Sequence, residues 1–501
     1  MKKNIVANYA SQGYVALIGI VMVPMYVKYM GAEAYGLVGF FAMIQAWFQL
    51  LDMGLTPTMA RATAQYRGGT GNALNLRRLL RALEGIFVGV ATLAGGAFIL
   101  FSEKLSVDWL NVQKLSHEEV RNALMLVGII VSLRWISGLY RGAVNGFEKM
   151  VWLSAFNIIV ASARFVLVVP VFIFIGTTPT VFFAYQLMIA LLELAILVMK
   201  VYRLLPKLTE SSFMPWDWRP LKDVLQFSLS IAFTSSIWVL VSQTDKLILS
   251  KLLPLGDYAY FTLAVLVAGG VTILSGPIST AVLPRLTRVA AEENGENFIR
   301  LYRTTTQLIG VVTIPAAVVL ALFAEQLLWA WTGDIVVAHK AAPVMALYAL
   351  GNSVLALAAF PYYLQYAKGN LRLHLLGNLL FVVLLIPSLI AATLKFGAIG
   401  AGAAWITSNV VYFIFWVPLV HVRFLPGLHI KWLTEDILKP LVIMVPLAFV
   451  MRYCISLPHN RILLFVCLVL IGIVLLAASA LGSELLRGRI RARFILKAGS
   501  N

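Results

Sequence analysis

The chain has 501 residues, of which 60% are hydrophobic and 12% are charged, and its formal net charge is +18 at pH 7. This composition excludes an ordinary soluble domain, which needs more charge to stay dissolved, and indicates a polytopic membrane protein. Only two cysteines occur, Cys454 and Cys467, so neither a disulfide framework nor a thiolate metal site is available.

Windows of about 20 apolar residues predict fourteen transmembrane helices in an all-α chain. In chain order they cover 5–30, 36–58, 82–101, 123–141, 151–175, 180–201, 224–250, 257–283, 304–331, 341–366, 371–394, 398–421, 437–456 and 461–483. The first apolar stretch is too long for the core of a signal peptide and lacks a small-residue cleavage site, so we expect it to be retained as a span.

The loops between these helices alternate in charge. Arginine and lysine concentrate in the loops 61–81, 200–222 and 285–303 and in the C-terminal tail, whereas the loop 102–121 carries four carboxylates. Because cytoplasmic loops collect basic residues, we expect a multi-pass membrane protein with both termini in the cytoplasm. The positive net charge is then mostly a signal of topology, and no nucleic-acid partner is expected.

The two halves of the chain resemble each other. GAEAYGLVGF at 31–40 resembles LGDYAYFTLA at 255–264, and ILFSEKL at 99–105 resembles ALFAEQL at 321–327. Two single residues fall opposite each other at nearly the same offset, Arg61 with Arg285 and Asn157 with Asn378. Such constancy indicates an internal duplication of about six spans.

The duplication predicts a six-helix lobe at 1–205, a cytoplasmic linker at 206–223 and a second six-helix lobe at 224–422. Two additional spans at 423–483 and a basic cytoplasmic tail at 484–501 would follow. Because each copy has an even number of spans, both enter the membrane in the same direction, and their pseudo-two-fold axis lies along the membrane normal. Two lobes facing a shared cavity are typical of alternating-access carriers.

Arginines occur inside the predicted fourth and fifth spans. Arg134 lies about eleven residues into the fourth span, and Arg141 shares its helix face but is close enough to the cytoplasmic end to snorkel. Arg164 reaches a similar depth in the fifth span, and Glu193 is central in the sixth. Two interpretations stay open: Glu193 neutralises Arg164 in a buried pair, or the arginines line an anion-binding cavity, since guanidinium groups match phosphate oxygens.

Other charged residues are candidates for gating or ion coupling. Asp52 is either such a group or a hydrogen-bonded structural carboxylate at a helix broken by glycine and proline. Asp245 and Lys246 are adjacent and point about 100° apart on a helix, so they are not expected to neutralise each other. Asp52, Glu193 and Asp245 are the only carboxylates expected clearly within spans, so any coupling to a proton or sodium gradient should involve one of them.

Polar residues and motifs elsewhere give weaker signals. Arg61 and Arg285 lie at inner helix ends, where topology explains them as readily as gating does. The amides within spans fit helix contacts or a cavity that accepts sugar hydroxyls: Asn8, Gln12, Gln45, Gln49, Asn157, Gln186, Gln243, Asn352, Asn378 and Asn409. No metal-binding, nucleotide-binding or hydrolase motif occurs, so no cofactor is expected.

Several short motifs carry a family resemblance. They are GAEAYG after the first span, LLDMGLTPTMAR closing the second, RGAVNGFEKM after the fourth, and QTDKLILS and LGDYAYF around the seventh. With them the chain resembles the Wzx-type O-antigen and polysaccharide flippases of the MOP exporter superfamily. Most members of that group have twelve spans, whereas fourteen is typical of the lipid II flippase branch.

The resemblance implies a transporter of the bacterial inner membrane rather than an enzyme. It would move an undecaprenyl-pyrophosphate-linked oligosaccharide from the cytoplasmic to the periplasmic leaflet, in contact with membrane lipid and with other polysaccharide assembly proteins. A cationic cavity would bind the headgroup, and Arg134, Arg141, Arg164 and Lys246 are the residues here that would supply it. A multidrug or cation antiporter of the same superfamily and a membrane glycan polymerase or ligase remain alternatives.

Overall fold

The structure, a computed structural model, describes residues 2–206, 219–292 and 295–483, and for 219–235 only the helix backbone. The predicted basic tail and most of the predicted linker lie outside the described residues. Within them the chain is helical and forms no strand. It divides into two compact units, Met1–Ala259 and Tyr260–Asn501, and each is described by itself.

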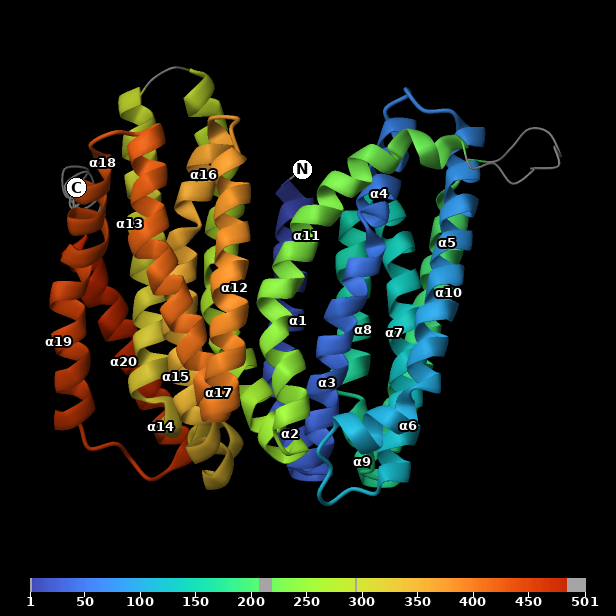
Figure 1. Ribbon diagram of the computed structural model, residues 1–501, viewed down its shortest axis with the longest axis horizontal. Coiled ribbons are helices and arrows are strands. Elements are labelled where there is room, and N and C mark those ends of the chain that lie inside the picture. The colour runs from blue at the N-terminus through green and yellow to red at the C-terminus, as the bar shows by residue number, and fades with distance from the viewer. Residues whose placement is uncertain (1, 207–218, 293–294, 484–501) are drawn as a thin grey trace, which may run out of the picture. The chain divides into compact units, whose positions relative to one another are not determined.

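The first unit contains ten helices of seven or more residues in its described part (Figure 1). They are α1 (Lys2–Val21), α2 (Val23–Met30), α3 (Ala32–Phe48), α4 (Leu55–Arg67), α5 (Ala73–Leu100), α7 (His117–Gly146), α8 (Met150–Phe165), α9 (Val168–Phe174), α10 (Pro179–Leu204) and α11 (Arg219–Leu252). Short helical segments are η1 (Gln49–Asp52), α6 (Ser102–Lys104) and η2 (Leu105–Trp109).

The second unit takes up most of α12 (Leu255–Ala291) and everything that follows. Its other elements are α13 (Gly295–Leu322), α14 (Ala324–Thr332), α15 (Ile335–Ala358), α16 (Phe360–Ala367), α17 (Arg372–Phe424), α18 (Leu428–Lys431), η3 (Trp432–Leu438), α19 (Lys439–Cys454) and α20 (Arg461–Gly482). The two additional C-terminal spans belong to this unit, because Met444 of α19 and Leu468 of α20 are buried in the same apolar core as Tyr302 of α13.

Twelve helices of the described residues are long and apolar enough to cross a membrane, so the predicted count of fourteen is not confirmed. Two of the predicted spans, 371–394 and 398–421, both lie within α17. A third, 224–250, falls on α11, where side chains are described only from residue 236. The all-helical polytopic architecture itself is confirmed.

The helix α17 is a hairpin rather than a rod. Its 53 residues would measure about 80 Å as one straight helix, far more than the roughly 30 Å of a hydrocarbon core. At Gly397 the backbone leaves the helical region, with φ at 58° and ψ at −137°. The two arms then run antiparallel, because Phe381 packs edge-on against Tyr412 and Gly377 lies directly against Trp416.

The internal duplication is visible in the backbone of each unit. The helix α5 ends at Leu100 and α13 at Leu322, within the two matching ILFSEKL-like segments. Glu148 and Gly369 both adopt left-handed backbone conformations, in the turns that precede α8 and α17. Equivalent sequence segments therefore begin and end helices at equivalent places.

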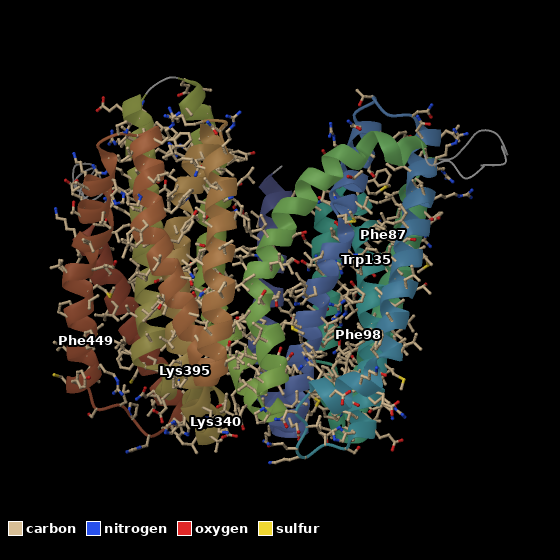
Figure 2. The ribbon with its side chains drawn as sticks, in the orientation of Figure 1. Phe87, Phe98, Trp135, Lys340, Lys395 and Phe449 are labelled. Carbon is tan, nitrogen blue, oxygen red and sulfur yellow. The ribbon has the colours of Figure 1, made fainter. Side chains whose placement is uncertain are left out.

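Apolar side chains lie both inside the units and on their surfaces. Inside the first unit, Phe87 of α5 stacks on Trp135 of α7 with ring centroids 4.3 Å apart (Figure 2). On the surface, Leu100 is 82% and Phe174 is 84% exposed. Large apolar side chains exposed along helices of this length indicate faces that contact lipid.

Candidate functional site

Three arginines and one glutamate meet inside the first unit. Arg134 and Arg141 lie about two turns apart on one face of α7, Arg164 lies in the last turn of α8, and Glu193 lies on α10. The helix α10 packs against α7, so residues at similar depth in the two helices can touch. The similar depths predicted for Arg134, Arg164 and Glu193 agree with this meeting, whereas Arg141 was predicted nearer the cytoplasmic end.

Glu193 holds two arginines at once. Its Oε1 accepts a hydrogen bond from Arg141 Nη2, and its Oε2 accepts one from Arg164 Nη2. The Glu193 side chain is only 2% exposed, and the Arg141 side chain, 28% exposed, also donates to Asn157 Oδ1. The pair expected between Arg164 and Glu193 is therefore present but shared. The prediction that Arg141 snorkels is wrong, because a buried carboxylate and an amide hold it inside the unit.

Arg134 is held differently, by uncharged groups. Its Nη1 donates to Gln45 Oε1 and its Nη2 donates to Gln186 Oε1, both at 2.9 Å. Its guanidinium carbon lies 4.9 Å from the centre of the Phe41 ring. Gln186 in turn donates from Nε2 to the backbone oxygen of Arg164 at 2.9 Å, which connects the two arginines. Within the described part of the chain, Arg134 has no carboxylate partner.

The cluster consequently carries excess positive charge. The cluster contains three guanidinium groups and one carboxylate, that of Glu193, so its formal charge is +2. The Nε atoms of Arg134 and Arg164 are also buried without a hydrogen-bond partner among the described residues. Buried charge without a counter-charge is costly, and in a membrane protein it usually marks a ligand or ion pathway.

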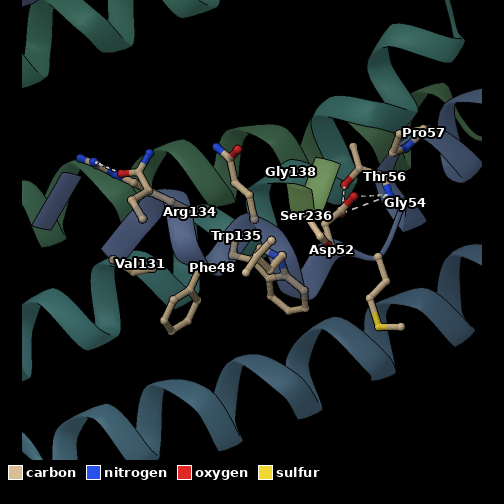
Figure 3. A pocket seen from close by; sticks show the side chains of 14 residues that line it. Phe48, Asp52, Gly54, Thr56, Pro57, Val131, Arg134, Trp135, Gly138 and Ser236 are labelled. Carbon is tan, nitrogen blue, oxygen red and sulfur yellow. Dashed lines mark hydrogen bonds between the residues drawn. The ribbon is translucent and has the colours of Figure 1, made fainter. Parts of the chain in front are cut away.

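Arg134 also lines a cavity of about 320 Å³ that reaches the break between α3 and α4 (Figure 3). Its polar lining residues are Gln45, Gln49, Asp52, Thr56, Arg134 and Ser236. Figure 3 shows Arg134 on the left of the view and Asp52 to the right of its centre. The cavity therefore presents a cation and a carboxylate at separate places, with amides and hydroxyls among them.

Asp52 lies at the break in the second span rather than within a continuous helix. Its carboxylate accepts from the Thr56 hydroxyl at 2.5 Å and from the Thr56 N–H at 3.2 Å. Met53 and Gly54 adopt left-handed conformations, so α3 and η1 end here and α4 begins in a new direction. The structural interpretation of Asp52 matches these contacts, although the carboxylate also faces the cavity.

A close approach of α4 to α7 forms one wall of the cavity. A Cβ atom added at Gly142 would lie 2.7 Å from the backbone oxygen of Thr56, so only glycine fits there. The motifs LLDMGLTPTMAR and RGAVNGFEKM are therefore in contact: Gly142 of the second allows the helix α4, which contains Thr56 of the first, to approach α7 closely.

The remaining predicted residues lie elsewhere. Lys246 Nζ is 3.2 Å from Asp245 Oδ1 and donates to Ser242 O at 2.6 Å, with Asp245 buried. The prediction that these neighbours do not neutralise each other is wrong, because the flexible lysine side chain turns back along the helix. Arg61 of α4 and Arg285 of α12 are exposed, each in its own unit.

A second buried ionic cluster lies in the second unit, where none was predicted. Arg303 donates from Nε and Nη2 to the two carboxylate oxygens of Asp436, both at 2.8 Å, and from Nη2 to Glu435 at 2.5 Å. Gln307 donates to Asp436 at 2.6 Å, and the Asp436 side chain is fully buried. The prediction that Asp52, Glu193 and Asp245 are the only carboxylates within spans is wrong, because the candidate span extends over Leu428–Cys454 and includes Asp436.

Comparisons of the sequence with known proteins identify a family and a relative. The model of a family described as polysaccharide biosynthesis protein matches residues 1–290. A Shigella flexneri protein described as a candidate O-antigen transporter is 21% identical over 412 residues, covering 80% of this chain and 93% of that protein.

Two solved structures share the fold. The lipid II flippase MurJ, in an inward closed conformation, superposes with a TM-score of 0.72 at 16% identity, covering 95% of this chain and 98% of that chain. An inward-facing multidrug resistance transporter of the MATE family, of the MOP superfamily, gives a TM-score of 0.68 at 13% identity over 82% of this chain and 94% of its own. At these identities the likeness shows a common two-lobe fold.

Proposed function

The chain belongs to the polysaccharide biosynthesis protein family, and from that premise we propose that it is a flippase for lipid-linked oligosaccharide. It moves an undecaprenyl-pyrophosphate-linked repeat unit from the cytoplasmic to the periplasmic leaflet of the bacterial inner membrane. Alternating access of the two units carries the headgroup, and the polyprenyl chain stays in lipid. The descriptions of the Shigella relative and of MurJ support this class of substrate.

The observation that carries the proposal is the excess positive charge around Arg134. A pyrophosphate with attached sugars cannot cross about 30 Å of hydrocarbon unaided, so a carrier must supply compensating charge inside the membrane. Arg134 offers it in a form that is available, because its two partners are neutral amide oxygens. Phosphate oxygens carry the negative charge that the amide oxygens lack and match the guanidinium fork in bidentate geometry, so they displace those amides.

The two glutamine side chains also serve the bound state. A carboxamide presents an acceptor oxygen to Arg134 when no substrate is bound, and after rotation it presents its NH2 group to a phosphate oxygen. Gln45 and Gln186 therefore satisfy the arginine before binding and the pyrophosphate after it. The amide contacts lower the cost of emptying the site, and the Nε atoms of Arg134 and Arg164, which have no partner among the described residues, are further donors for a bound phosphate.

Glu193 limits how tightly the headgroup is held. It pairs Arg141 and Arg164 when the site is empty and competes with phosphate for the same guanidinium groups. A transport site must release its cargo, so a resident counter-ion that restores the empty state favours turnover. The sequence left two interpretations open, a buried pair and an anion-binding cavity. In this proposal the buried pair is the empty state of the site and anion binding is its loaded state.

The cavity beside Arg134 suits the part of the headgroup next to the lipid. About 320 Å³ is at the lower end of ligand pockets, so it holds a pyrophosphate and an adjoining sugar rather than a whole oligosaccharide. Asp52, Gln49 and Ser236 supply acceptors and donors of the kind that sugar hydroxyls use. Coupling to a proton or sodium gradient would act through Asp52, Glu193 or Asp245, as predicted from the sequence, or through the buried Asp436.

A cation antiporter is the second candidate, because the MATE structure shares the fold and Asp52 faces the cavity. The excess positive charge of the arginine cluster disfavours it, since cationic cargo needs carboxylates or aromatic faces. A polymerase or ligase needs a large catalytic segment on the outer side. The longest predicted outer loop, 102–121, is short, which disfavours this alternative.

Deleting the gene tests the proposal. We expect the lipid-linked repeat unit to accumulate on the cytoplasmic leaflet, and wild-type protein to restore surface glycan. Unchanged glycan together with a gain in susceptibility to cationic drugs would overturn it in favour of the antiporter.

A further inference from the structure

A second basic pocket lies in the second unit, at the open end of the α17 hairpin. It has a volume of about 680 Å³, and its lining includes Asn370, Arg372, Leu373, Leu419, Val422 and Arg423. These residues come from the turn before α17, from its first turn and from its last two turns. The pocket is separate from the arginine cluster, which belongs to the first unit.

The register of the hairpin explains why the two arginines meet. Gly377 of the first arm lies against Trp416 of the second, and each step along one arm is matched by a step back along the other. Five residues from that contact, Arg372 comes opposite position 421 and therefore close to Arg423. The fifty residues between Arg372 and Arg423 form the two arms of the hairpin, which bring the two arginines to one end of it.

Both guanidinium groups are available to a ligand. Arg372 and Arg423 are exposed, and in the described ranges neither pairs with a carboxylate. Asn370 uses its side-chain oxygen to accept the Arg372 N–H at 3.2 Å, which leaves its NH2 group as a further donor. Two guanidinium forks and an amide donor form a set that matches phosphate oxygens.

The wall below these donors is apolar and exposed. Leu419 is 47% and Val422 is 66% exposed, and they lie on the same helix face as Arg423. On the opposing arm, Leu375 and Leu376 are 42% and 47% exposed, one turn beyond Arg372. Phosphate-binding groups next to lipid-facing leucine and valine place the pocket at a boundary between headgroups and acyl chains.

We propose that this pocket binds the phosphate of an anionic phospholipid of the surrounding bilayer. The predicted topology puts this end of α17 on the cytoplasmic side, and basic pockets between transmembrane helices on that side hold anionic headgroups. The acyl chains run along Leu419, Val422 and Leu376. A free phosphate offers the same chemistry to the arginines but gains nothing from the apolar wall. The proposal does not depend on what the protein transports.

Native mass spectrometry of the purified full-length protein tests this assignment. The protein in detergent is titrated with phosphatidylglycerol and, separately, with zwitterionic phosphatidylcholine, and glycerol phosphate is added as a soluble competitor. The test variant is Arg372→Gln with Arg423→Gln. Its matched control is Lys104→Gln with Lys395→Gln, which removes two exposed cations elsewhere. A third variant with lysine at 372 and 423 keeps the charge and removes the forks.

We expect wild type and control to retain phosphatidylglycerol over phosphatidylcholine. The glutamine variant should bind phosphatidylglycerol about twenty-five-fold more weakly, roughly fivefold for each arginine, and the lysine variant should fall between them. Equal binding by the glutamine variant and wild type would overturn the site. Displacement of phosphatidylglycerol by glycerol phosphate at an equal concentration would show a site for soluble phosphate and would also overturn the proposal. Displacement by undecaprenyl pyrophosphate at lower concentrations than phosphatidylglycerol would make the pocket a substrate entry, and the proposal would fail.

Discussion

Replacing Glu193 by glutamine should destabilise the first unit more than removing either arginine that it binds. The substitution keeps the shape of the side chain but removes the one negative charge in a cluster of three guanidinium groups. Breaking a buried pair by removing one partner costs about 3–5 kcal/mol, and Glu193 is 2% exposed. Replacing Arg164 by alanine leaves Glu193 paired with Arg141. The cost should then be closer to the roughly 1.5–3 kcal/mol of one charged hydrogen bond, about half of the cost of Glu193→Gln.

The shared carboxylate also changes what a double variant should do. With both Arg164 and Glu193 replaced, Arg141 still lacks its counter-charge, so recovery of stability should be partial. Removing Arg141 as well should complete it.

Thermal unfolding in detergent, followed by fluorescence of the twelve tryptophans, measures these differences. The matched control is Glu84→Gln, because the Glu84 carboxylate accepts hydrogen bonds from the hydroxyls of Tyr140 and Tyr202, at 2.9 and 3.0 Å, in the described part of the chain. We expect the order of melting temperatures to be wild type, Glu84→Gln, Arg164→Ala and Glu193→Gln, from high to low. A Glu193→Gln protein that melts with wild type, or above Arg164→Ala, would refute the reasoning.

Three further outcomes are expected. Asp436→Asn should lower the melting temperature by weakening the bidentate contact with the Arg303 guanidinium, at a cost of about 2–4 kcal/mol, and a Gln307→Met control should cost less. Gly36→Ala should reduce the yield of folded protein, because the added Cβ would lie 2.3 Å from the backbone oxygen of Leu255, whereas Gly13→Ala, with open space around it, should not. A single cysteine in the loop 102–121 of a cysteine-free protein should react with a membrane-impermeant maleimide in intact cells, and labelling only after permeabilisation would reverse the predicted topology.

The arginine cluster shows how far sequence reasoning extends. Helical rise placed Arg134, Arg164 and Glu193 at similar depths, and the structure brings them together. Which partner each arginine takes depends on how each helix is rotated about its axis, and hydropathy does not report this rotation. For that reason the sequence identified Gln45, Asn157 and Gln186 as polar residues within spans but did not predict which arginine each of them contacts.

The second ionic cluster shows a different limit. Asp436 and Glu435 fall in a π-helical segment, η3, that directly precedes α19, the helix of the predicted span 437–456. A window of apolar residues therefore starts after them and assigns them to a loop. Asp245 and Lys246 illustrate a third limit, since backbone geometry separates their directions but a long flexible side chain can still return to its neighbour.

The central claim is that the uncompensated guanidinium of Arg134 binds the pyrophosphate of a lipid-linked oligosaccharide. The most direct measurement is flipping of undecaprenyl-pyrophosphate-linked saccharide by purified protein in proteoliposomes, with wild type, Arg134→Lys and Arg134→Ala compared at equal protein content and matched melting temperature. We predict full activity, partial activity and none in that order, because lysine keeps the charge but loses the fork of donors. Wild-type rates of flipping by folded Arg134→Ala protein would contradict the claim.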